Sequence, residues 1–454
     1  MKPIIGLEIH GYIDTKEKLF CTCKNTIKSE KPNTNICPVC TGNPGSKPML
    51  PNKQALKKSI QIALMLNTKV NAVEKGKKLI WQRKHYNWAD LPKGYQNTLS
   101  GTYAVPIGEK GKFSGIRIRE LHLEEDPAAW DPITGCIDYN RSGAPLIEIV
   151  TEPDFISSEQ VAEWLKQLIL TLSYIKALNK NAGIKADVNV NISGLSERTE
   201  IKNVNSISEI VKAIEYELAR HAKEKPKFME TRRWNSQKNI TESMRTKETH
   251  ADYRFISDPD LPSISIKEKY VKEIEKTLPE SPKEKLDKLI KKHKIDEKNA
   301  KILTKNLELV ELFEELAKEL DIKKHISWLT IELLRVLNYN KKTLDEIDVK
   351  PEHLAELINA VSKKQVTELK AKQIMNEFIP NSFSISKKKN IEKIEDNLIE
   401  KFAKQAIKEN AKAVADYKEG KKESLNFLIG QVMKLSNRRA DFNTARKELE
   451  KLLK

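Results

Sequence analysis

The feature that most constrains the fold of this chain is a change in sequence character near residue 283. Before it, short alternating apolar and polar runs are separated by turns such as Asn43-Pro44-Gly45 and Pro92-Lys93-Gly94, which predicts a sheet interrupted by a few helices. After it, glycine almost disappears, Lys, Glu and Leu dominate, and leucines recur at helical spacing from Leu309 to Leu320. We therefore predict an α+β protein in which a body containing a sheet is followed by helices.

Three domains are expected within the 454 residues. Residues 1–290 form the α+β body with an antiparallel sheet, residues 291–385 an all-α helical domain, and residues 386–454 a small helical tail domain. The second boundary follows the break at Ile379-Pro380-Asn381. Within the body, residues 53–66 and 158–176 are predicted helices, the second with a capping box from Ser157 and Gln160.

The strand predicted at the start of the chain, from Ile4 to His10, carries two ionisable side chains on one face. Ile5, Leu7 and Ile9 can pack downward, so Glu8 and His10 point up together. A carboxylate beside an imidazole on a rigid strand is suited to binding a divalent cation.

Two further predicted strands bring acids to the same face. Glu124 faces away from the core in the run from Leu121 to Asp126, and Glu148 does so in the run from Leu146 to Glu152. Together with Glu8 and His10 they form a set of hard ligands of the kind that Mg²⁺ prefers. Strand alternation disfavours Glu125 unless a bulge reverses it. The alternative is a group of solvated carboxylates on the open face of an antiparallel sheet.

Basic residues in Gly-rich or polar turns form a second set. The ones we select are Arg83, Lys93, Arg141 and Lys202. Cations next to an acidic metal site are what a nucleoside triphosphate needs, and the chain has no Walker A or dinucleotide fingerprint. Each residue taken singly fits an ordinary surface salt bridge equally well.

Four cysteines, Cys21, Cys23, Cys37 and Cys40, have the spacing C-x-C-x₁₃-C-x₂-C. In a cytosolic chain, such clustering favours a closed, structural Zn²⁺ site, with unpaired reduced thiols as the alternative. The fifth cysteine, Cys136, stands apart.

The formal net charge of +17 favours an acidic partner, and nucleic acid is the simplest one. Abundant Lys and Glu are also typical of hyperthermophile proteins. The longest apolar run, Ile60 to Leu66, is too short to span a bilayer, and we recognise no signal peptide. A cytoplasmic protein is therefore expected.

Longer motifs carry a resemblance that runs from end to end of the chain. They are Gly6-Leu-Glu-Ile-His10, Lys18-Leu-Phe-Cys21, Pro32-Asn-Thr-Asn-Ile-Cys-Pro-Val-Cys40, Asp90-Leu-Pro-Lys-Gly-Tyr-Gln96, His122-Leu-Glu-Glu-Asp126, Asn140-Arg-Ser-Gly-Ala-Pro-Leu-Ile-Glu-Ile-Val-Thr-Glu-Pro-Asp154, Glu200-Ile-Lys-Asn-Val-Asn-Ser206, Asp258-Pro-Asp-Leu261, Asp416-Tyr-Lys-Glu-Gly420 and Phe427-Leu-Ile-Gly-Gln-Val-Met433. This series resembles the GatB family, the B subunits of tRNA-dependent aspartyl/glutamyl amidotransferases.

The resemblance implies an ATP-dependent carbon–nitrogen ligase with glutamine as the amido donor. Such a protein phosphorylates the side-chain carboxylate of Glu on tRNA(Gln) or of Asp on tRNA(Asn), and ammonia then displaces the phosphate. The ammonia comes from a separate amidase subunit, GatA, usually braced by small GatC, which fits the lack of a Gly-Ser-rich amidase segment in this sequence. The body would be a cradle similar to glutamine synthetase, and the tail domain, similar to YqeY, would bind tRNA.

The resemblance also implies roles for the residues selected above. Glu8, His10, Glu148 and one or both of Glu124 and Glu125 would hold Mg²⁺, the four basic residues would bind ATP phosphates, and the cysteine segment 21–40 would be a zinc-binding insertion in the cradle.

One departure concerns the edge of the metal pocket, where Gly11-Tyr12 follows His10 in place of the family's more usual apolar–Gln/Glu stretch. The related GatE proteins carry an insertion for which 454 residues leave no room. The alternatives are a non-catalytic, zinc-bearing tRNA-binding protein, a GatE-like paralogue without its insertion, or an ATP-grasp-like ligase for a small molecule.

Overall fold

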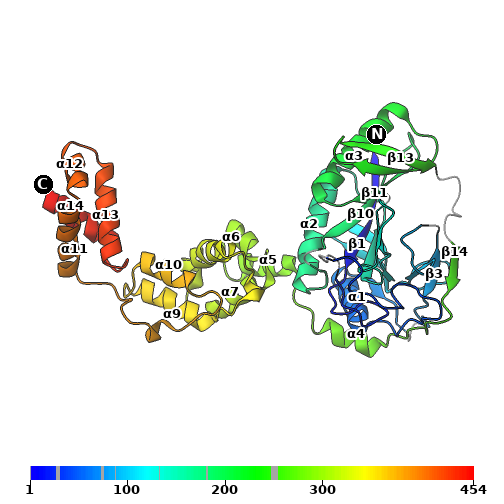
Figure 1. Ribbon diagram of the computed structural model, residues 1–454, viewed down its shortest axis with the longest axis horizontal. Coiled ribbons are helices and arrows are strands. Elements are labelled where there is room, and N and C mark those ends of the chain that lie inside the picture. The colour runs from blue at the N-terminus through cyan, green and yellow to red at the C-terminus, as the bar shows by residue number, and fades with distance from the viewer. Residues whose placement is uncertain are drawn as a thin grey trace. The chain divides into compact units, whose positions relative to one another are not determined.

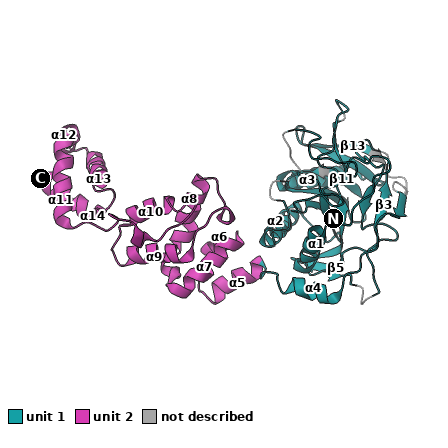
Figure 2. Ribbon diagram, turned by 60° about the horizontal axis from the view of Figure 1, so that its bottom comes forward, with its two compact units in different colours: residues 1–281 teal, residues 282–454 magenta. Residues whose placement is uncertain are grey.

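The structure is a computed structural model that describes residues 2–26, 31–72, 76–86, 88–131, 133–179, 182–246 and 254–453. It divides into two compact units, residues 1–281 and 282–454 (Figure 2). The predicted boundary at residue 290 lies inside helix α5 (Pro282–Lys291), whose Leu289 packs into the core of the second unit. The α+β character of the chain is confirmed.

Unit 1 is built around a 12-stranded sheet whose main path runs β13-β12-β11-β10-β1-β9-β6-β4-β3-β14, with β5 pairing β6 and β2 (Figure 1). Its strands are β1 (Pro3–Tyr12), β2 (Lys69–Val70), β3 (Gln82–His85), β4 (Gln96–Thr98), β5 (Gly108–Phe113), β6 (Ile116–Glu125), β9 (Pro145–Thr151), β10 (Ile184–Ile192), β11 (Thr199–Val204), β12 (Glu230–Asn235), β13 (Ile240–Thr246) and β14 (Arg254–Ser257), while β7 (Ala129–Trp130) and β8 (Ile137–Asp138) pair separately.

The sheet is mixed, which corrects the prediction of an antiparallel one. Strands β11 and β12 pair in parallel, because α3 (Ile207–Glu224) connects them as a crossover helix. The other strand pairs among the described residues are antiparallel.

The two helices predicted in the body form where expected. Helix α1 (Lys53–Met65) begins after Asn52, whose side chain accepts hydrogen bonds from the backbone N–H groups of Gln54 and Ala55. Helix α2 (Ser158–Tyr174) begins after Ser157, which accepts from the N–H of Gln160. A fourth helix, α4 (Glu268–Glu275), follows β14.

Helices α1, α2 and α3 cover one face of the sheet. Ile5, Leu7 and Ile9 of β1 are buried in the same core as Leu165 of α2 and Ile214 of α3. Because side chains alternate along a strand, the even-numbered residues of β1, Glu8 and His10 among them, face the other way. The helices thus leave uncovered the opposite face of the sheet, which carries Glu8 and His10 and is called the acidic face below.

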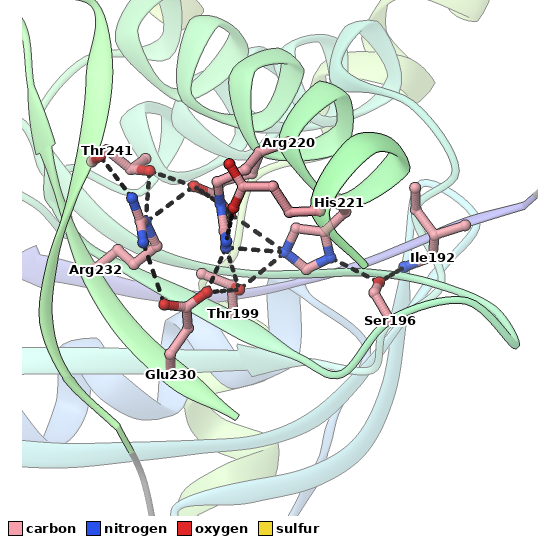
Figure 3. Close-up of polar contacts among 10 residues, drawn as sticks. Ile192, Ser196, Thr199, Arg220, His221, Glu230, Arg232 and Thr241 are labelled. Carbon is pink, nitrogen blue, oxygen red and sulfur yellow. Dashed lines mark hydrogen bonds and ion pairs between the residues drawn. The ribbon is translucent and has the colours of Figure 1, made fainter. Parts of the chain in front are cut away.

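A buried polar network fastens α3 to the sheet (Figure 3). Glu217 on α3 accepts hydrogen bonds from Arg220 on the same helix, and its carboxylate lies 3.3 Å from Nε of Arg232 on β12. His221 bonds Thr199 of β11 at 2.9 Å and Ser196 at 2.7 Å. The network therefore links the crossover helix to both strands that it connects.

Unit 2 is built from helices. Its elements are α5, α6 (Glu297–Leu303), α7 (Leu307–Glu319), a 3₁₀ turn at Ile322–His325, a π-helical stretch at Trp328–Leu333, α8 (Leu334–Tyr339), α9 (Pro351–Ser362), α10 (Glu368–Asn376), α11 (Asp396–Glu409), α12 (Ala411–Lys418), α13 (Glu423–Leu435) and α14 (Phe442–Leu453), with short 3₁₀ turns at Leu344–Glu346 and Ile385–Lys387. Two hydrophobic clusters serve them, one from Leu289 to Ile391 and one from Ile394 to Leu453.

Among the described residues, no helix has both the length and the apolar character needed to cross a membrane.

Candidate active site

The acidic face of the sheet is assembled by the register of β1 with its two neighbours. His10 lies opposite Glu148 on β9 and opposite Lys185 on β10, while Glu8 lies opposite Asp187 on β10. Directly opposite residues in antiparallel strands share a face. The pairing therefore collects charged side chains from three strands over the centre of the sheet.

The first cluster joins His10, Glu124 and Glu148. Nε2 of His10 lies 3.5 Å from Glu148 Oε2 and 3.7 Å from Glu124 Oε1. His122 on β6 adds a second imidazole, with its Nε2 at 2.8 Å from the same Glu148 oxygen. Strand alternation predicted the first three of these residues as neighbours, and the structure brings them together.

A second cluster lies beside it and joins Glu8, Asp187 and Glu200, whose carboxylate oxygens lie within 4.8 Å of one another. Lys202 Nζ lies 2.7 Å from both Asp187 and Glu200. Asn189 donates to Glu8 at 3.2 Å, and Thr231 donates to Glu200 at 3.2 Å. Asp187 was not selected from the sequence, because nothing in the run Ile184–Ile192 indicates which strand pairs with it.

Burial and mutual charge shift the pKa values of these groups. Burial raises the pKa of Glu8 and that of Glu124, and the charge of Glu148 raises both further. Burial also opposes ionisation of Glu148, but the imidazoles of His122 and His10 hold its pKa well below the ordinary value. Burial disfavours the charged form of His10, yet Glu148 outweighs this and raises the pKa of His10 to about 9.

Both clusters open into one cavity of about 370 Å³. Its lining is dominated by acidic and basic side chains: Glu8, His10, Lys84, Asp90, Glu124, Asp126, Arg141, Glu148, Lys185, Asp187, Glu200 and Lys202, together with Tyr12, Tyr86, Gln96, Pro127 and Leu146. At one wall, Tyr12 donates to Asp126 at 2.7 Å and Arg141 Nε lies 2.8 Å from the same carboxylate. Such a mixture of charges suits a phosphorylated ligand that arrives with cations.

Two of the four selected basic residues line this cavity, Arg141 and Lys202, and the other two do not. Arg83 binds Asp258 at 2.9 Å and Asp260 at 2.8 Å. Lys93 pairs with Glu125, whose carboxylate also accepts from the N–H of Asn97 at 2.9 Å. Glu125 is thereby directed away from the acidic clusters.

Two further lysines, Lys84 and Lys185, line the cavity although they are not among the four basic residues selected from the sequence. Lys84 follows Arg83 on β3, so alternation places the two on opposite faces. Alternation along β3 would predict that only one of Lys84 and Arg83 faces the cavity. The sequence does not say which of the two it is, because that depends on the pairing of β3 with β4 and β14.

The four-cysteine cluster forms as predicted from its spacing, with all four Sγ atoms within 4.8 Å of one another. The Sγ atoms of Cys37 and Cys40 lie 3.9 Å apart, close to the distance of about 3.8 Å expected around a tetrahedral ion with Zn–S bonds of about 2.3 Å. A hydrogen bond from Cys21 and the nearby Lys18 ammonium lower the pKa of Cys40 to about 4. Residues 27–30 of this segment lie outside the described residues.

The donor sets fit the cations that the sequence suggested. Glu124 Oε2 and His122 Nδ1 are buried without a hydrogen-bond partner in the described structure, and carboxylates whose pKa values are raised by burial gain most from a neighbouring cation. Oxygen and imidazole ligands fit Mg²⁺ at the sheet, and four thiols fit Zn²⁺ at the cysteine cluster.

Comparison with known proteins gives two family matches. A family model described as the GatB/GatE catalytic domain matches residues 3–272, and one described as the GatB domain matches residues 311–453. The chain is 44% identical to the B subunit of the aspartyl/glutamyl-tRNA(Asn/Gln) amidotransferase of Methanocaldococcus jannaschii, over 97% of this chain and 96% of that protein. It is 41% identical to the protein of the same name from Methanosphaera stadtmanae, over 99% of each chain. The chain therefore belongs to the GatB family of amidotransferase B subunits.

Proposed function

We propose that this chain is the ATP-using subunit of a tRNA-dependent amidotransferase, which amidates Glu on tRNA(Gln), Asp on tRNA(Asn), or both. The observation that carries the proposal is the shared cavity, in which two acidic clusters adjoin Lys202 and Arg141. The names of its relatives support the same reaction. A purely RNA-binding protein is disfavoured, because acids on a surface that faces RNA repel its phosphates.

In this proposal Glu124, Glu148 and His10 would hold one Mg²⁺, His10 as the neutral imidazole after the cation displaces its proton, and Glu8, Asp187 and Glu200 would supply oxygen ligands next to it. Bound there, Mg²⁺ neutralises charge on the phosphoryl group that ATP transfers. His122 holds Glu148 in place through its hydrogen bond, as a neighbour of a metal ligand commonly does.

The basic residues of the cavity act on the phosphate oxygens. Burial lowers the pKa of Lys202, but Asp187 and Glu200 raise it well above its usual range, so the ammonium stays charged. Burial also lowers the pKa of Arg141, but the charge of Asp126 outweighs this effect and raises it. The positive charges of Lys202 and Arg141 stabilise the negative charge that develops on the phosphoryl group during its transfer. The side-chain carboxylate of Glu or Asp on the tRNA is the acceptor, and the cavity positions it for in-line attack.

The remaining parts of the chain receive roles from the same proposal. Unit 1 acts as a cradle similar to glutamine synthetase, while residues 291–385 and the YqeY-like residues 386–454 bind tRNA, in keeping with the net charge of +17. An amidase subunit of the GatA type, with GatC as a brace, hydrolyses glutamine and supplies ammonia. Zn²⁺ on Cys21, Cys23, Cys37 and Cys40 is structural, since four thiolates leave no open position.

The test is a reaction of the purified chain with Glu-tRNA(Gln), Mg-ATP and ammonium chloride, without an amidase subunit. Formation of Gln-tRNA(Gln) is expected, and Asp-tRNA(Asn) in a parallel reaction defines the preference. If no product forms, and adding the amidase subunit with glutamine does not restore it, the transferase proposal fails and tRNA binding without catalysis takes its place.

A further inference from the structure

The turn that carries Arg141 into the cavity is covered on its outer side by the cysteine segment. Asn140 and Ser142 flank Arg141 and are only 2% and 3% exposed. Buried polar side chains of this kind are retained where their hydrogen bonds fix a geometry. Both residues direct their hydrogen bonds toward the cysteine segment and away from the cavity.

Asn140 makes three of these hydrogen bonds. Its Oδ1 accepts from the backbone N–H groups of Thr34 and Asn35 at 2.9 and 2.8 Å, and its Nδ2 donates to the carbonyl of Lys31 at 2.8 Å. Ser142 Oγ donates to the carbonyl of Cys40 at 2.7 Å. One short turn is thus bonded to both ends of the described stretch 31–40.

Other contacts strengthen the same connection. The N–H of Tyr139 donates to Asn33 Oδ1 at 2.7 Å, and buried Lys18 donates to the carbonyl of Tyr139 at 3.2 Å. Gly143 is positioned against Cys40, because a Cβ added there would lie 3.7 Å from the Cys40 Cβ. The cysteine residue and the turn therefore pack directly on each other.

Residues 31–36 are held in place mainly by polar contacts. Five of the six are exposed, and the apolar Ile36 is 37% exposed, so hydrophobic burial contributes little to their placement. Their position depends on the thiol cluster at Cys37 and Cys40 and on hydrogen bonds to residues 137–140. Besides the bonds of Asn140, Asn33 donates to Asp138 Oδ1 and to the carbonyl of Ile137, both at 2.9 Å.

We propose that Asn140, with Ser142, is a positioning residue that couples the ordered cysteine segment to Arg141. The inference rests on the proposed function, since it assigns Arg141 to the phosphate-binding wall of the cavity. In this arrangement the four-cysteine cluster orders residues 31–40, these order the turn 139–144, and the turn aims the Arg141 guanidinium beside Asp126. The cluster thereby sets the geometry of the active site in addition to stabilising the fold.

The first experiment is a double-mutant cycle on the full chain with Asn140→Ala and Arg141→Met, measuring KM for ATP and kcat separately. We expect Asn140→Ala to raise KM for ATP roughly 10-fold, and to have little further effect in the Arg141→Met background, because interacting residues are non-additive. Asn71→Ala is the matched control, since Asn71 is equally buried and its side chain donates to the carbonyl of Pro106, outside the turn 139–144. Additive effects, or a change in KM equal to that of the control, would overturn the proposal.

The second experiment does not depend on activity. Hydrogen–deuterium exchange of the peptide 137–144 is measured in the full chain before and after removal of bound metal with a zinc-selective chelator, with strand β10 as the internal reference. Faster exchange in 137–144 alone supports the coupling even if the amidation reaction itself fails, and unchanged exchange overturns it. Ser142→Ala serves as the second variant if Asn140→Ala does not fold.

Discussion

At the scale of single residues, the acidic side chains of the cavity differ in what sets their pKa values. Glu148 owes its low pKa to two imidazoles, while burial keeps the pKa values of Glu8 and Glu124 raised. A cation that binds beside Glu8 and Glu124 would stabilise their ionised carboxylates, as the two imidazoles stabilise that of Glu148. The affinity for this cation therefore depends on each of these side chains.

Replacing Glu8 by Gln, or His10 by Ala, is expected to lower the rate of amidation by about 10²-fold or more, because each change removes a ligand of the proposed cation and a fixed charge of the cavity. Affinity for tRNA should change little, since neither residue lies in the helical unit. Filter binding of tRNA and product assays on the same preparations check this. A parallel loss of tRNA affinity would indicate that these residues serve folding instead.

The neighbours Lys84 and Arg83 offer a matched pair, because they alternate on one strand. Lys84 lines the cavity, whereas Arg83 binds Asp258 and Asp260. Lys84→Met should raise KM for ATP roughly 10-fold, and Arg83→Met should leave KM nearly unchanged while lowering the melting temperature, because it removes the cation that pairs with the buried Asp258 carboxylate. Steady-state kinetics over a range of ATP concentrations measure KM for both variants. A larger increase in KM for Arg83→Met than for Lys84→Met would instead assign Arg83 to phosphate binding.

At the scale of secondary-structure elements, alternation along strands explains what the sequence could predict. Glu8, His10, Glu124 and Glu148 were found because each lies in a run where ionisable side chains alternate with apolar ones such as Leu7, Ile9, Leu123 and Ile147. Asp187 was missed because its partner is set by the pairing of β10 with β1, which no local pattern reveals. The ion pair of Lys93 could not be predicted for a related reason, since Lys93 lies in a turn and its partner Glu125 lies on β6, 32 residues further along the chain.

The crossover helix α3 depends on its polar network, and this gives a pH prediction. Burial raises the pKa of Glu217, but hydrogen bonds from His221, Arg220 and Thr241 outweigh it and lower the pKa to about 2, from an ordinary value of 4.5. The stabilisation is therefore complete above about pH 4.5 and is lost as the pH falls toward 2. Glu217→Gln should cost about 3–5 kcal/mol at pH 7, as expected for breaking a buried ion pair.

The difference in unfolding free energy between wild type and Glu217→Gln should narrow by about 2 kcal/mol between pH 5 and pH 3. Urea unfolding followed by tryptophan fluorescence measures it, because five of the six tryptophans lie before residue 282. Glu224→Gln is the control on the same helix, since that side chain is 56% exposed and should contribute little. A difference that is independent of pH would contradict the role given to the Glu217 carboxylate.

At the scale of the whole molecule, unit 2 has two separate hydrophobic clusters, so the helices of one cluster can be deleted without exposing the core of the other. The change of composition near residue 283 led to a predicted boundary at residue 290, whereas the units divide between Ser281 and Pro282. The break at Ile379-Pro380-Asn381 predicted the second boundary after residue 385, whereas the two hydrophobic clusters divide between Ile391 and Ile394. Lys, Glu and Leu recur on both sides of residue 390, so only packing assigns these two residues to their clusters.

Truncation after Glu392 removes α11 to α14 and the cluster from Ile394 to Leu453, while it leaves the cores of unit 1 and of the preceding helices intact. We expect the truncated chain to keep the melting transition of unit 1 and to bind tRNA at least 10-fold more weakly, with a shallower dependence of log Kd on log salt concentration, because fewer cations meet the phosphates. Binding titrations at several salt concentrations measure both effects. Unchanged affinity and slope would remove the tail from the tRNA-binding surface and leave this role to the helices between α5 and α10.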